Sequence, residues 1–458
     1  MVFNVRVVSS YLPEVCGIAT HTQDLITALS HLDIVDSIRV ASIDKSKGEN
    51  VYNFPVDLVI DQYNEDSWVK AAYAILEKTY VKYLPTVIVL QHEYGLSGVK
   101  AQGNDYQNIA RLFKDGKNSI TVANLHTVSE RPDEHQKDVI KELSDLVDGM
   151  IVTTKSAIEI LSREPYNIDP NKIKHIDHGI RIHDLTNVDQ NQIKSKYKLD
   201  KKLIISTLGL KSEGKGIEYG IEAFGKMINK YFSSQNSSER KKIIYLIAGQ
   251  YHPNFIKERP ETYTAVERKI ERAVKNNKLN SIKTHFLEDL SEKDINENDV
   301  VFLDNRLSEK ELRELYLASD IILLPYRNRY QISSGILAEA VGSGKSVIAT
   351  KFAHAKELLC PGNNVKKRVV GMNPQSRGIL VDLIGKYKNI PSVKQMVNGL
   401  EYLVFNETAR AQMSQNARSR GHEMNWENVT REFANHISLL LERKFSPKKE
   451  EVVIEKSD

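Results

Sequence analysis

Residues 202–220 read KLIISTLGLKSEGKGIEYG and contain the parts of a strand-turn-helix unit. The apolar, β-branched run predicts a strand, and a cluster of glycines at 214, 216 and 220 follows it directly. Lys215 stands between two of these glycines, where its ammonium could reach a diphosphate. The glycine spacing is one residue longer than that of the dinucleotide fingerprint, which disfavours a nicotinamide site. A capping turn with a solvated lysine is the alternative interpretation.

The same alternation of short apolar runs and helical patterns extends through the chain, as expected for parallel sheets built from βαβ units. Before residue 202 the predicted strands are VRVVSS (5–10), IRVASI (38–43), PTVIVLQ (85–91), SITVANL (119–125), GMIVTT (149–154) and KIKHID (172–177). After it come IIYLIAG (243–249), DVVFLD (299–304), DIILLPY (320–326) and KSVIAT (345–350). The sequence therefore predicts an α/β protein with two Rossmann-like, doubly wound parallel sheets.

The chain has 458 residues, more than one hydrophobic core usually organises, so two domains of roughly 200 residues are expected. The polar stretch 186–202 places the predicted boundary near residue 195. We expect an N-terminal domain over 1–195, a C-terminal domain over 196–425 and a periodic helix over 426–442. The charged residues 443–458 are too poor in apolar side chains to fold alone, and we expect them to be disordered.

Composition narrows the class of protein. Lys and Arg number 64 against 60 Asp and Glu, a balance that argues against nucleic acid as the main partner. Two cysteines, Cys16 and Cys360, can form neither a disulfide framework nor a zinc site, which favours a reducing compartment. No run approaches the roughly 20 apolar residues of a membrane helix, and a cytoplasmic location is expected. Peripheral contact with the inner membrane face stays open, as does the oligomeric state.

Gly342–Ser346 reads GSGKS and resembles the end of an ATPase phosphate-binding loop. That motif requires a glycine five residues before Gly344, where this chain has Glu339. A carboxylate there would face the phosphates, so the ATPase interpretation is rejected.

Gln331 and Glu339 flank the expected start of a helix near Ser333. The amides of Ser333, Ser334 and Gly335 could receive an anion or sugar hydroxyls, and Glu339, two turns on, could accept hydrogen bonds from a ribose diol. A capped helix that happens to carry one carboxylate is the alternative.

The N-terminal half places a glycine turn at Gly17 and histidines near predicted strand ends, His92 in QHEYG and His126 in LHTV; His178 follows in IDHGI. Open α/β sheets bind ligands at the carboxyl ends of their strands, so these positions are candidates. The histidines lack zinc-motif spacing, and Asp-x-Asp is absent from the sequence. We therefore expect no essential metal and no cofactor.

Taken together, the segments resemble the retaining family 4 (group 1) glycosyltransferases, which have GT-B architecture with two Rossmann-like domains facing a cleft. The resemblance extends to about Leu441, and Trp426 resembles the tryptophan with which that family's last helix crosses back to the N-terminal domain. It is carried by CGIATHTQDL (16–25), QHEYG (91–95), LHTV (125–128), IDHGI (176–180), LGLKSEGKGIE (208–218), LIAGQYHP (246–253), LYLASDIILLPY (315–326) and QISSGILAEAVGSGKSVIAT (331–350).

The resemblance implies roles for individual positions. Glu339 matches the family's ribose-binding glutamate and Lys215 its diphosphate-binding lysine. Further donor-binding positions are implied at Gly17, Ile18, Gln331, Ser333, Ser334 and Gly335. His126 matches the histidine that approaches the sugar. The candidate catalytic residues are therefore taken from three of these positions: His126, Lys215 and Gln331. The acceptor is expected near His92, Glu93 and His178.

Two positions depart from the family pattern. Gln331 replaces the first glutamate of its E-x7-E signature, and Leu210 replaces an arginine that shares the diphosphate with the lysine. Glutamine can still bond a sugar hydroxyl, but it brings no charge to a developing oxocarbenium ion. Arg327 or Arg329 could supply the missing diphosphate contact; a surface pair of arginines is the alternative.

The predicted activity is retaining transfer of a hexosyl unit from a nucleotide diphosphate sugar to the hydroxyl of a glycan, lipid-linked or small-molecule acceptor. A glycan phosphorylase or nucleotide-sugar epimerase of the same fold, or a non-catalytic scaffold that binds sugar nucleotides, are the alternatives. The sequence selects no base, sugar or acceptor.

Overall fold

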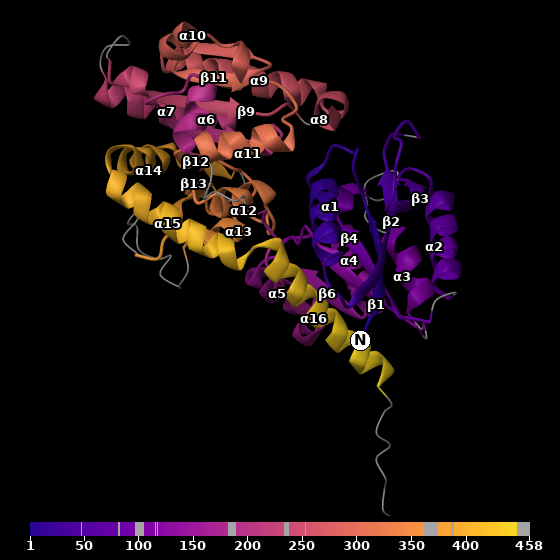
Figure 1. The fold of residues 1–458 in the computed structure, drawn as a ribbon. Coiled ribbons are helices and arrows are strands. Elements are labelled where there is room, and N and C mark those ends of the chain that lie inside the picture. The colour runs from indigo at the N-terminus through magenta and orange to yellow at the C-terminus, as the bar shows by residue number, and fades with distance from the viewer. Residues whose placement is uncertain are drawn as a thin grey trace, which may run out of the picture. The chain divides into compact units, whose positions relative to one another are not determined.

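The computed structural model describes residues 1–46, 48–80, 83–96, 105–114, 116, 118–181, 189–232, 238–251, 253–360, 374–385 and 389–446. The chain forms two compact units (Figure 1). Unit 1 comprises Met1–Asp177 and Glu427–Asp458, and unit 2 comprises His178–Trp426. The predicted tail falls outside the described residues from 447 onward.

Unit 1 is built on a parallel seven-stranded sheet in the order β3-β2-β1-β4-β5-β6-β7. Its strands are β1 (Phe3–Ser9), β2 (Val35–Asp44), β3 (Val56–Asp61), β4 (Thr86–His92), β5 (Ser119–Leu125), β6 (Gly149–Val152) and β7 (Ile173–His175). All six strands predicted in this half are present. Strand β3 was not predicted, because it is an edge strand with alternating exposed positions rather than a continuous apolar run.

The helices of unit 1 follow the strands along the chain. They are α1 (Gly17–Leu29), α2 (Glu65–Tyr80), α3 (Asp105–Phe113), α4 (Glu134–Leu146), α5 (Lys155–Ser162) and α16 (Trp426–Phe445). Within unit 1, α16 is fastened by an ion pair between Lys444 Nζ and Asp148 Oδ1 at 3.0 Å. Leu440 packs so closely against Gly149 that a Cβ there would lie 2.8 Å from its methyl carbon. The helix extends to Phe445, beyond the predicted end at residue 442.

Unit 2 contains a second parallel seven-stranded sheet, in the order β10-β11-β9-β8-β12-β13-β14. Its strands are β8 (Leu203–Leu208), β9 (Ile243–Ala248), β10 (Ser281–Thr284), β11 (Val300–Leu303), β12 (Ile321–Leu324), β13 (Ser346–Thr350) and β14 (Gly378–Val381). A separate antiparallel hairpin pairs β15 (Leu383–Ile384) with β16 (Ile390–Pro391). The five predicted strands are present, whereas the short edge strands β10 and β14 were missed.

Helices cover both faces of the unit 2 sheet. They are α6 (Gln190–Lys196), α7 (Ile217–Tyr231), α8 (Pro253–Glu258), α9 (Pro260–Asn276), α10 (Glu292–Glu297), α11 (Glu309–Ala318), α12 (Gly335–Gly342), α13 (Ala353–Leu359), α14 (Val393–Phe405) and α15 (Glu407–Glu423). Successive strand residues enter different cores: Ile204 packs with α11 and α12, and Ile205 with α7 and α14. This alternation is expected for a sheet buried on both faces.

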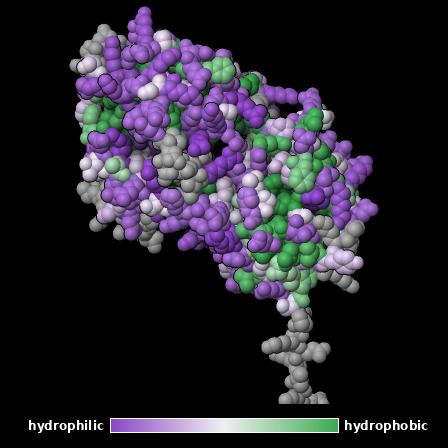
Figure 2. All heavy atoms as spheres, viewed as in Figure 1, coloured by the Kyte–Doolittle hydropathy of each residue, from purple (hydrophilic) through white to green (hydrophobic). Residues whose placement is uncertain are grey.

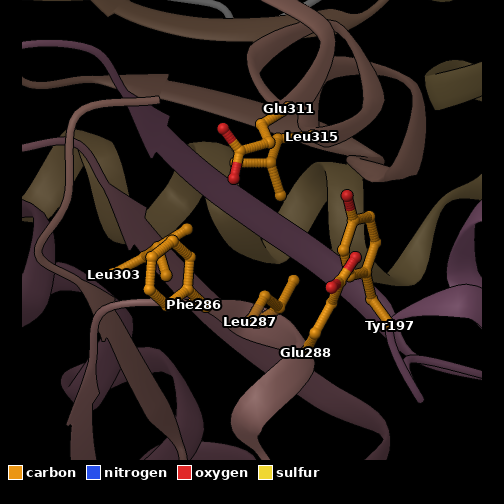
Figure 3. A pocket seen from close by; sticks show the side chains of 7 residues that line it. All are labelled: Tyr197, Phe286, Leu287, Glu288, Leu303, Glu311 and Leu315. Carbon is orange, nitrogen blue, oxygen red and sulfur yellow. The ribbon is translucent and has the colours of Figure 1, made fainter. Parts of the chain in front are cut away.

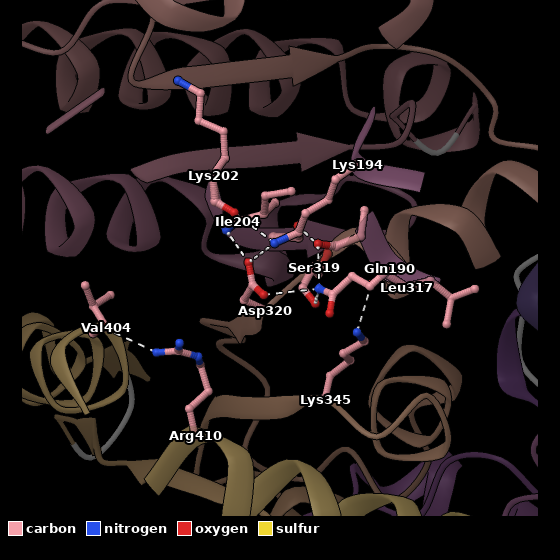
Figure 4. Close-up of polar contacts among 12 residues, drawn as sticks. Gln190, Lys194, Lys202, Ile204, Leu317, Ser319, Asp320, Lys345, Val404 and Arg410 are labelled. Atoms are coloured by element: carbon pink, nitrogen blue, oxygen red, sulfur yellow. Dashed lines mark hydrogen bonds and ion pairs between the residues drawn. The ribbon is translucent and has the colours of Figure 1, made fainter. Parts of the chain in front are cut away.

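The predicted domain boundary near residue 195 lies inside unit 2. Helix α6 packs against α11, and Lys194 Nζ donates to Asp320 Oδ2 at 2.8 Å and to the Lys202 carbonyl at 2.8 Å (Figure 4). Gln190 Nε2 donates to Asp320 Oδ1 at 3.1 Å. Because Asp320 directly precedes β12, these bonds bind the polar stretch to the second sheet. The units divide after Asp177 instead.

The two units differ in surface character. Figure 2 shows a face on which hydrophilic residues dominate unit 2, while hydrophobic areas are broader on unit 1. The large apolar side chains exposed on unit 1 include Val51, Phe54, Val59, Tyr73 and Tyr83. Among the described residues, no helix combines the length and the apolar character that spanning a bilayer requires.

Candidate functional site

Each sheet has a switch point, where the strand order reverses and neighbouring connections leave in opposite directions. In unit 2 it lies between β8 and β12, and in unit 1 between β1 and β4. Ligands of open α/β sheets bind outside the carboxyl ends of the strands at such points. The predicted glycine turns follow β8 and β1, so the sequence motifs and the topology select the same places.

The turn after β8 brings Lys215 to the unit 2 switch point. Residues Glu213–Lys215 form a short 3-10 turn, and Gly216 follows with φ of +62°. A Cβ at Gly216 would lie 2.1 Å from the Pro325 carbonyl oxygen, so only glycine fits there. The glycine that the motif supplies therefore permits the turn to touch the chain leaving β12.

Arg327 ties that turn to the end of β12. Its amide donates to the Gly214 carbonyl at 2.8 Å, and its Nη1 forms an ion pair with Glu213 Oε1 at 3.0 Å. Lys215 Nζ lies 3.9 Å from the centre of the Tyr326 ring. Lys215 on the turn and Arg327 bound to it thus bring two cationic side chains to one place, an arrangement that suits an anion.

The second candidate arginine lies elsewhere. Arg329 Nε donates to Asn389 Oδ1 at 2.7 Å, and its Nη2 donates to the Gly385 carbonyl at 3.3 Å, next to the β15–β16 hairpin. Of the two arginines predicted to replace the charge missing at Leu210, Arg327 contacts the turn that carries Lys215, whereas Arg329 bonds Asn389 and Gly385. Lys211, beside Leu210, is ion-paired with Asp304.

Helix α12 begins at Gly335, close to the predicted start. Ser334 is its N-cap, and the Ser334 hydroxyl accepts from the Leu337 amide at 3.3 Å. The Ser334 amide donates to His354 Nδ1 at 3.0 Å. This amide, predicted to meet the donor sugar, therefore already has a partner, and His354 is a site residue that the sequence analysis missed.

Gln331 lies in the loop before α12, where its amide group is used as a donor. Its side-chain Nε2 donates to the Ser333 carbonyl at 2.9 Å, and its backbone carbonyl accepts from the His354 amide at 3.1 Å. A carboxylate cannot make the first of these bonds, because it has no hydrogen to donate. The departure from glutamate at this position thus has a local structural reason.

Glu339 is half-buried on α12, and its surroundings are polar. Its Oε1 accepts from the Arg181 amide at 3.4 Å, while the Arg181 guanidinium pairs with Glu309 at 2.6 Å. Burial, together with the charge of Glu339, raises the pKa of Tyr316 well above its usual range. Arg181 and Tyr316 are further neighbours that sequence reasoning did not single out.

His178, predicted to approach the acceptor from the N-terminal domain, belongs to unit 2. Its Nδ1 bonds the Gly179 carbonyl at 2.7 Å, and its ring lies 6.5 Å from that of His354. A Cβ placed on Gly335 would lie 3.6 Å from His178 Nε2. The structure therefore groups His178 with the start of α12 and the donor-side candidates.

Lys345, the lysine of the GSGKS segment, has a structural role. Lys345 Nζ donates to the Leu317 carbonyl at 2.9 Å, and burial lowers the pKa of its ammonium to about 8 (Figure 4). Its side chain is committed to the protein interior, which agrees with rejecting the phosphate-loop interpretation.

In unit 1, the predicted glycine turn leads into α1. Cys16 is the N-cap: its Sγ accepts from the Ala19 amide at 3.3 Å and lies 3.0 Å from Ser10 Oγ. Gly17 is exposed as the first helical residue, and no atom lies within 4 Å of the place a Cβ would take. Ile18, which follows, is half-buried. The first turn of α1 thus has open space beside it.

His126 is held by neutral side chains at the ends of β4 and β5. Its Nε2 lies 2.7 Å from Gln91 Oε1, which also accepts from Asn124 Nδ2 at 2.8 Å. The ring of His21 meets the His126 ring edge-on at 5.0 Å. Since an amide oxygen only accepts, the proton lies on His126 Nε2. Gln91 fixes the tautomer of His126, a role that the QHEYG motif did not reveal.

The other two acceptor candidates of unit 1 are less accessible. His92 is fully buried, with its ring against Tyr94 at 5.1 Å and Tyr106 at 5.3 Å. Thr127 Oγ1 donates to Glu93 Oε2 at 2.6 Å, and burial raises the pKa of Glu93. The structure therefore places His92 in the core and gives the half-buried Glu93 a hydrogen-bonded position.

A small pocket in unit 2 includes none of the predicted site residues. Figure 3 shows that it is lined by Tyr197, Phe286, Leu287, Glu288, Leu303, Glu311 and Leu315. It lies between the chain following α6, the end of β11 and helix α11, away from the Lys215 turn.

Solved structures resemble the whole chain in fold. HepE from Anabaena, solved in complex with UDP, matches with a TM-score of 0.66 at 13% identity, over 95% of this chain and 100% of HepE. A sucrose-phosphate synthase from Thermosynechococcus elongatus matches with a TM-score of 0.66 at 15% identity, over 96% and 100% of the two chains. WaaG, a glycosyltransferase involved in lipopolysaccharide biosynthesis, matches with a TM-score of 0.57 at 13% identity, over 95% and 100%.

No protein-family model and no curated protein sequence matches this chain. The likeness in fold, together with two parallel seven-stranded sheets, confirms the predicted class: α/β of GT-B type with two Rossmann-like domains.

Proposed function

We propose that this chain is a retaining glycosyltransferase that moves a hexosyl unit from a nucleotide diphosphate sugar to an acceptor hydroxyl without an essential metal. The arrangement at the unit 2 switch point carries the proposal. Lys215 follows β8 and Glu339 follows β12, and these strands are neighbours in the sheet. A cation and a carboxylate at one switch point suit the diphosphate and ribose of a nucleotide. HepE, which shares the fold, was solved with UDP-glucose.

In the proposed reaction, the bond between the anomeric carbon and the diphosphate oxygen breaks while the acceptor oxygen attacks from the same face. The departing diphosphate takes the acceptor's proton. Lys215, with Arg327 and the amides of the turn, stabilises the negative charge that grows on the diphosphate. No pair of carboxylates is then needed at the anomeric carbon.

The remaining candidates take supporting roles in the proposal. Glu339 accepts hydrogen bonds from the ribose hydroxyls, and Gln331 contacts the transferred sugar. In unit 1, Gly17, Ile18 and His126 form the proposed part of the site for the sugar and acceptor. Gln91 Oε1 holds the Nε2 edge of the His126 ring, which fixes the orientation of the imidazole in this part of the site.

The first test is a thermal-shift screen of the purified chain against sugar nucleotides of each base, followed by transfer assays with the stabilising donor. A transferase releases nucleoside diphosphate at a rate that depends on the acceptor, forms a product with the donor's anomeric configuration, and keeps its activity in EDTA. Nucleotide binding without turnover across glycan, lipid-linked and small-molecule acceptors would instead indicate a scaffold. Acceptor-independent conversion of the sugar would indicate an epimerase.

A further inference from the structure

We propose that Tyr326 is a positioning residue for Lys215: its ring holds the lysine ammonium at the diphosphate position without neutralising it. The inference rests on the proposed function of Lys215. Tyr326 directly follows Pro325 at the end of β12, in a segment that the sequence analysis treated only as an apolar strand.

The first observation is the contact itself. Lys215 Nζ lies 3.9 Å from the centre of the Tyr326 ring, well inside the range of cation–π attraction. Tyr326 is 1% exposed, so this attraction acts in a poorly solvated place, where it is strongest. A flexible four-carbon side chain is thereby confined before any ligand arrives.

The second observation is that the ring cannot easily move. It stacks on Phe352 with centroids 5.4 Å apart and planes at 22°. The Tyr326 carbonyl accepts from Thr350 Oγ1 at 2.6 Å, which ties β12 to β13. The close approach of Gly216 to Pro325 and the bond from the Arg327 amide to Gly214 then hold the lysine turn against the same segment.

The third observation concerns charge. Within the described part of the chain, Lys215 forms no ion pair, and Glu213 on the same turn is paired with Arg327. A carboxylate partner would compete with a phosphate for the ammonium, whereas an aromatic ring attracts the cation and leaves its full charge available. The ring is therefore a better partner than a carboxylate for a lysine that must bind an anion.

The hydroxyl of Tyr326 supplies a matched control. It is buried and has no hydrogen-bond partner among the described residues. Tyr326→Phe keeps the ring and removes only this group, while Tyr326→Leu removes the π face. If the ring is what matters, Phe should behave as wild type and Leu should not.

The test measures affinity for UDP, GDP and ADP by calorimetry in the wild type, Tyr326→Phe, Tyr326→Leu, Lys215→Ala and the Tyr326→Leu, Lys215→Ala double variant. We expect Tyr326→Leu to weaken the best nucleoside diphosphate about three- to tenfold, Tyr326→Phe to leave its affinity unchanged, and Tyr326→Leu to add nothing in the Lys215→Ala background. Wild-type affinity in Tyr326→Leu, or the same loss with and without Lys215, overturns the inference. A loss in Tyr326→Phe as large as that in Tyr326→Leu overturns it too.

Fluorinated phenylalanines at position 326 keep the test decisive if Tyr326→Leu does not fold. Fluorine withdraws electron density from the ring face while nearly preserving its shape, so affinity should fall stepwise with each fluorine, and a flat series contradicts a cation–π role.

If the wild type binds none of the three nucleotides, the proposed function fails and the inference fails with it. If Lys215→Ala weakens binding but no Tyr326 variant does, only the inference fails.

Discussion

The two switch points have the same topology but carry different polar side chains. In unit 2, Glu213 and Lys215 lie on the turn after β8, Arg327 lies in the loop after β12, and Glu339 lies on α12. In unit 1, the ends of β4 and β5 carry Gln91, Asn124 and His126 in one hydrogen-bonded group, and Glu93, whose pKa is raised by burial, follows β4. Cationic side chains suit an anion, whereas amide and imidazole groups suit a hydroxyl-bearing ligand. The fold thus supplies two equivalent positions, and the side chains decide what each can bind.

The largest expected effect comes from removing the Lys215 ammonium. Lys215→Ala should lower kcat about 100-fold or more, the scale of losing one preorganised group that stabilises transition-state charge. Folding should change little, because the ammonium forms no described ion pair. Steady-state kinetics with the best donor, beside thermal unfolding, measures both.

Lys215→Arg is the matched control, since it keeps the charge while changing the geometry, and it should retain part of the activity. Near-normal transfer by a folded Lys215→Ala variant would show that the charged character of this switch point has no catalytic role.

The second prediction places a charge at Gln91. In Gln91→Glu, a carboxylate beside the ring favours the imidazolium form of His126, so the pH profile of kcat should shift upward. The fully buried position should also cost about 1–3 kcal/mol of unfolding free energy.

Gln91→Leu is the control for this change, because it removes the same hydrogen bonds without adding charge. It should lower activity without shifting the pH profile. Identical profiles for wild type and Gln91→Glu would contradict the role given to the Gln91–His126 bond.

Most of the fold was predictable because fully buried parallel strands are continuous apolar runs that a single sequence displays. The missed strands β3 and β10 lie at sheet edges and have partly exposed residues, so they lack that signal. The boundary was placed near residue 195 because residues 186–202 are polar. Some of these polar side chains attach the segment to unit 2 instead. Lys194 and Gln190 on α6 form hydrogen bonds with Asp320, which directly precedes β12 of the second sheet.

The candidate site was predictable where glycine geometry dictates the sequence, as at Gly216. It was not predictable where a role depends on partners distant along the chain. Tyr326 meets Lys215 only because β8 and β12 are adjacent, and His354 reaches the Ser334 amide from a helix beyond the next strand. His92 shows the converse, since a histidine at a strand end is here a core residue.

The third prediction concerns a half-buried histidine of unit 1. His436 on α16 has Nε2 without a hydrogen-bond partner among the described residues. Burial, reinforced by Lys174 and Arg443, lowers the pKa of His436 to about 4. The unfolded chain takes up this proton near pH 6.5 and the folded chain only near pH 4, so stability is complete above about 6.5 and falls between these values. We expect a loss of about 1–2 kcal/mol for this half-buried group.

Denaturant unfolding of wild type and His436→Leu between pH 4 and 7.5 measures that slope, and the variant should show a flatter dependence. An equal slope in both proteins would assign the acid sensitivity to other groups.

The smallest effect is expected at Gln331, an uncharged residue of unit 2 at a position where the resembled family has a glutamate. Gln331→Glu restores the carboxylate of the resembled family, and charge considerations alone predict higher activity. The structure predicts the reverse, because Gln331 Nε2 donates to the Ser333 carbonyl and a carboxylate at that place would repel it. We expect a loss of about 1 kcal/mol in unfolding free energy and a few-fold fall in kcat.

Gln331→Met, which removes the donor without adding repulsion, should lose less stability. A rise in kcat for Gln331→Glu at unchanged stability would show that the loop before α12 can reorganise, and that the missing charge, rather than the Ser333 bond, limits transfer.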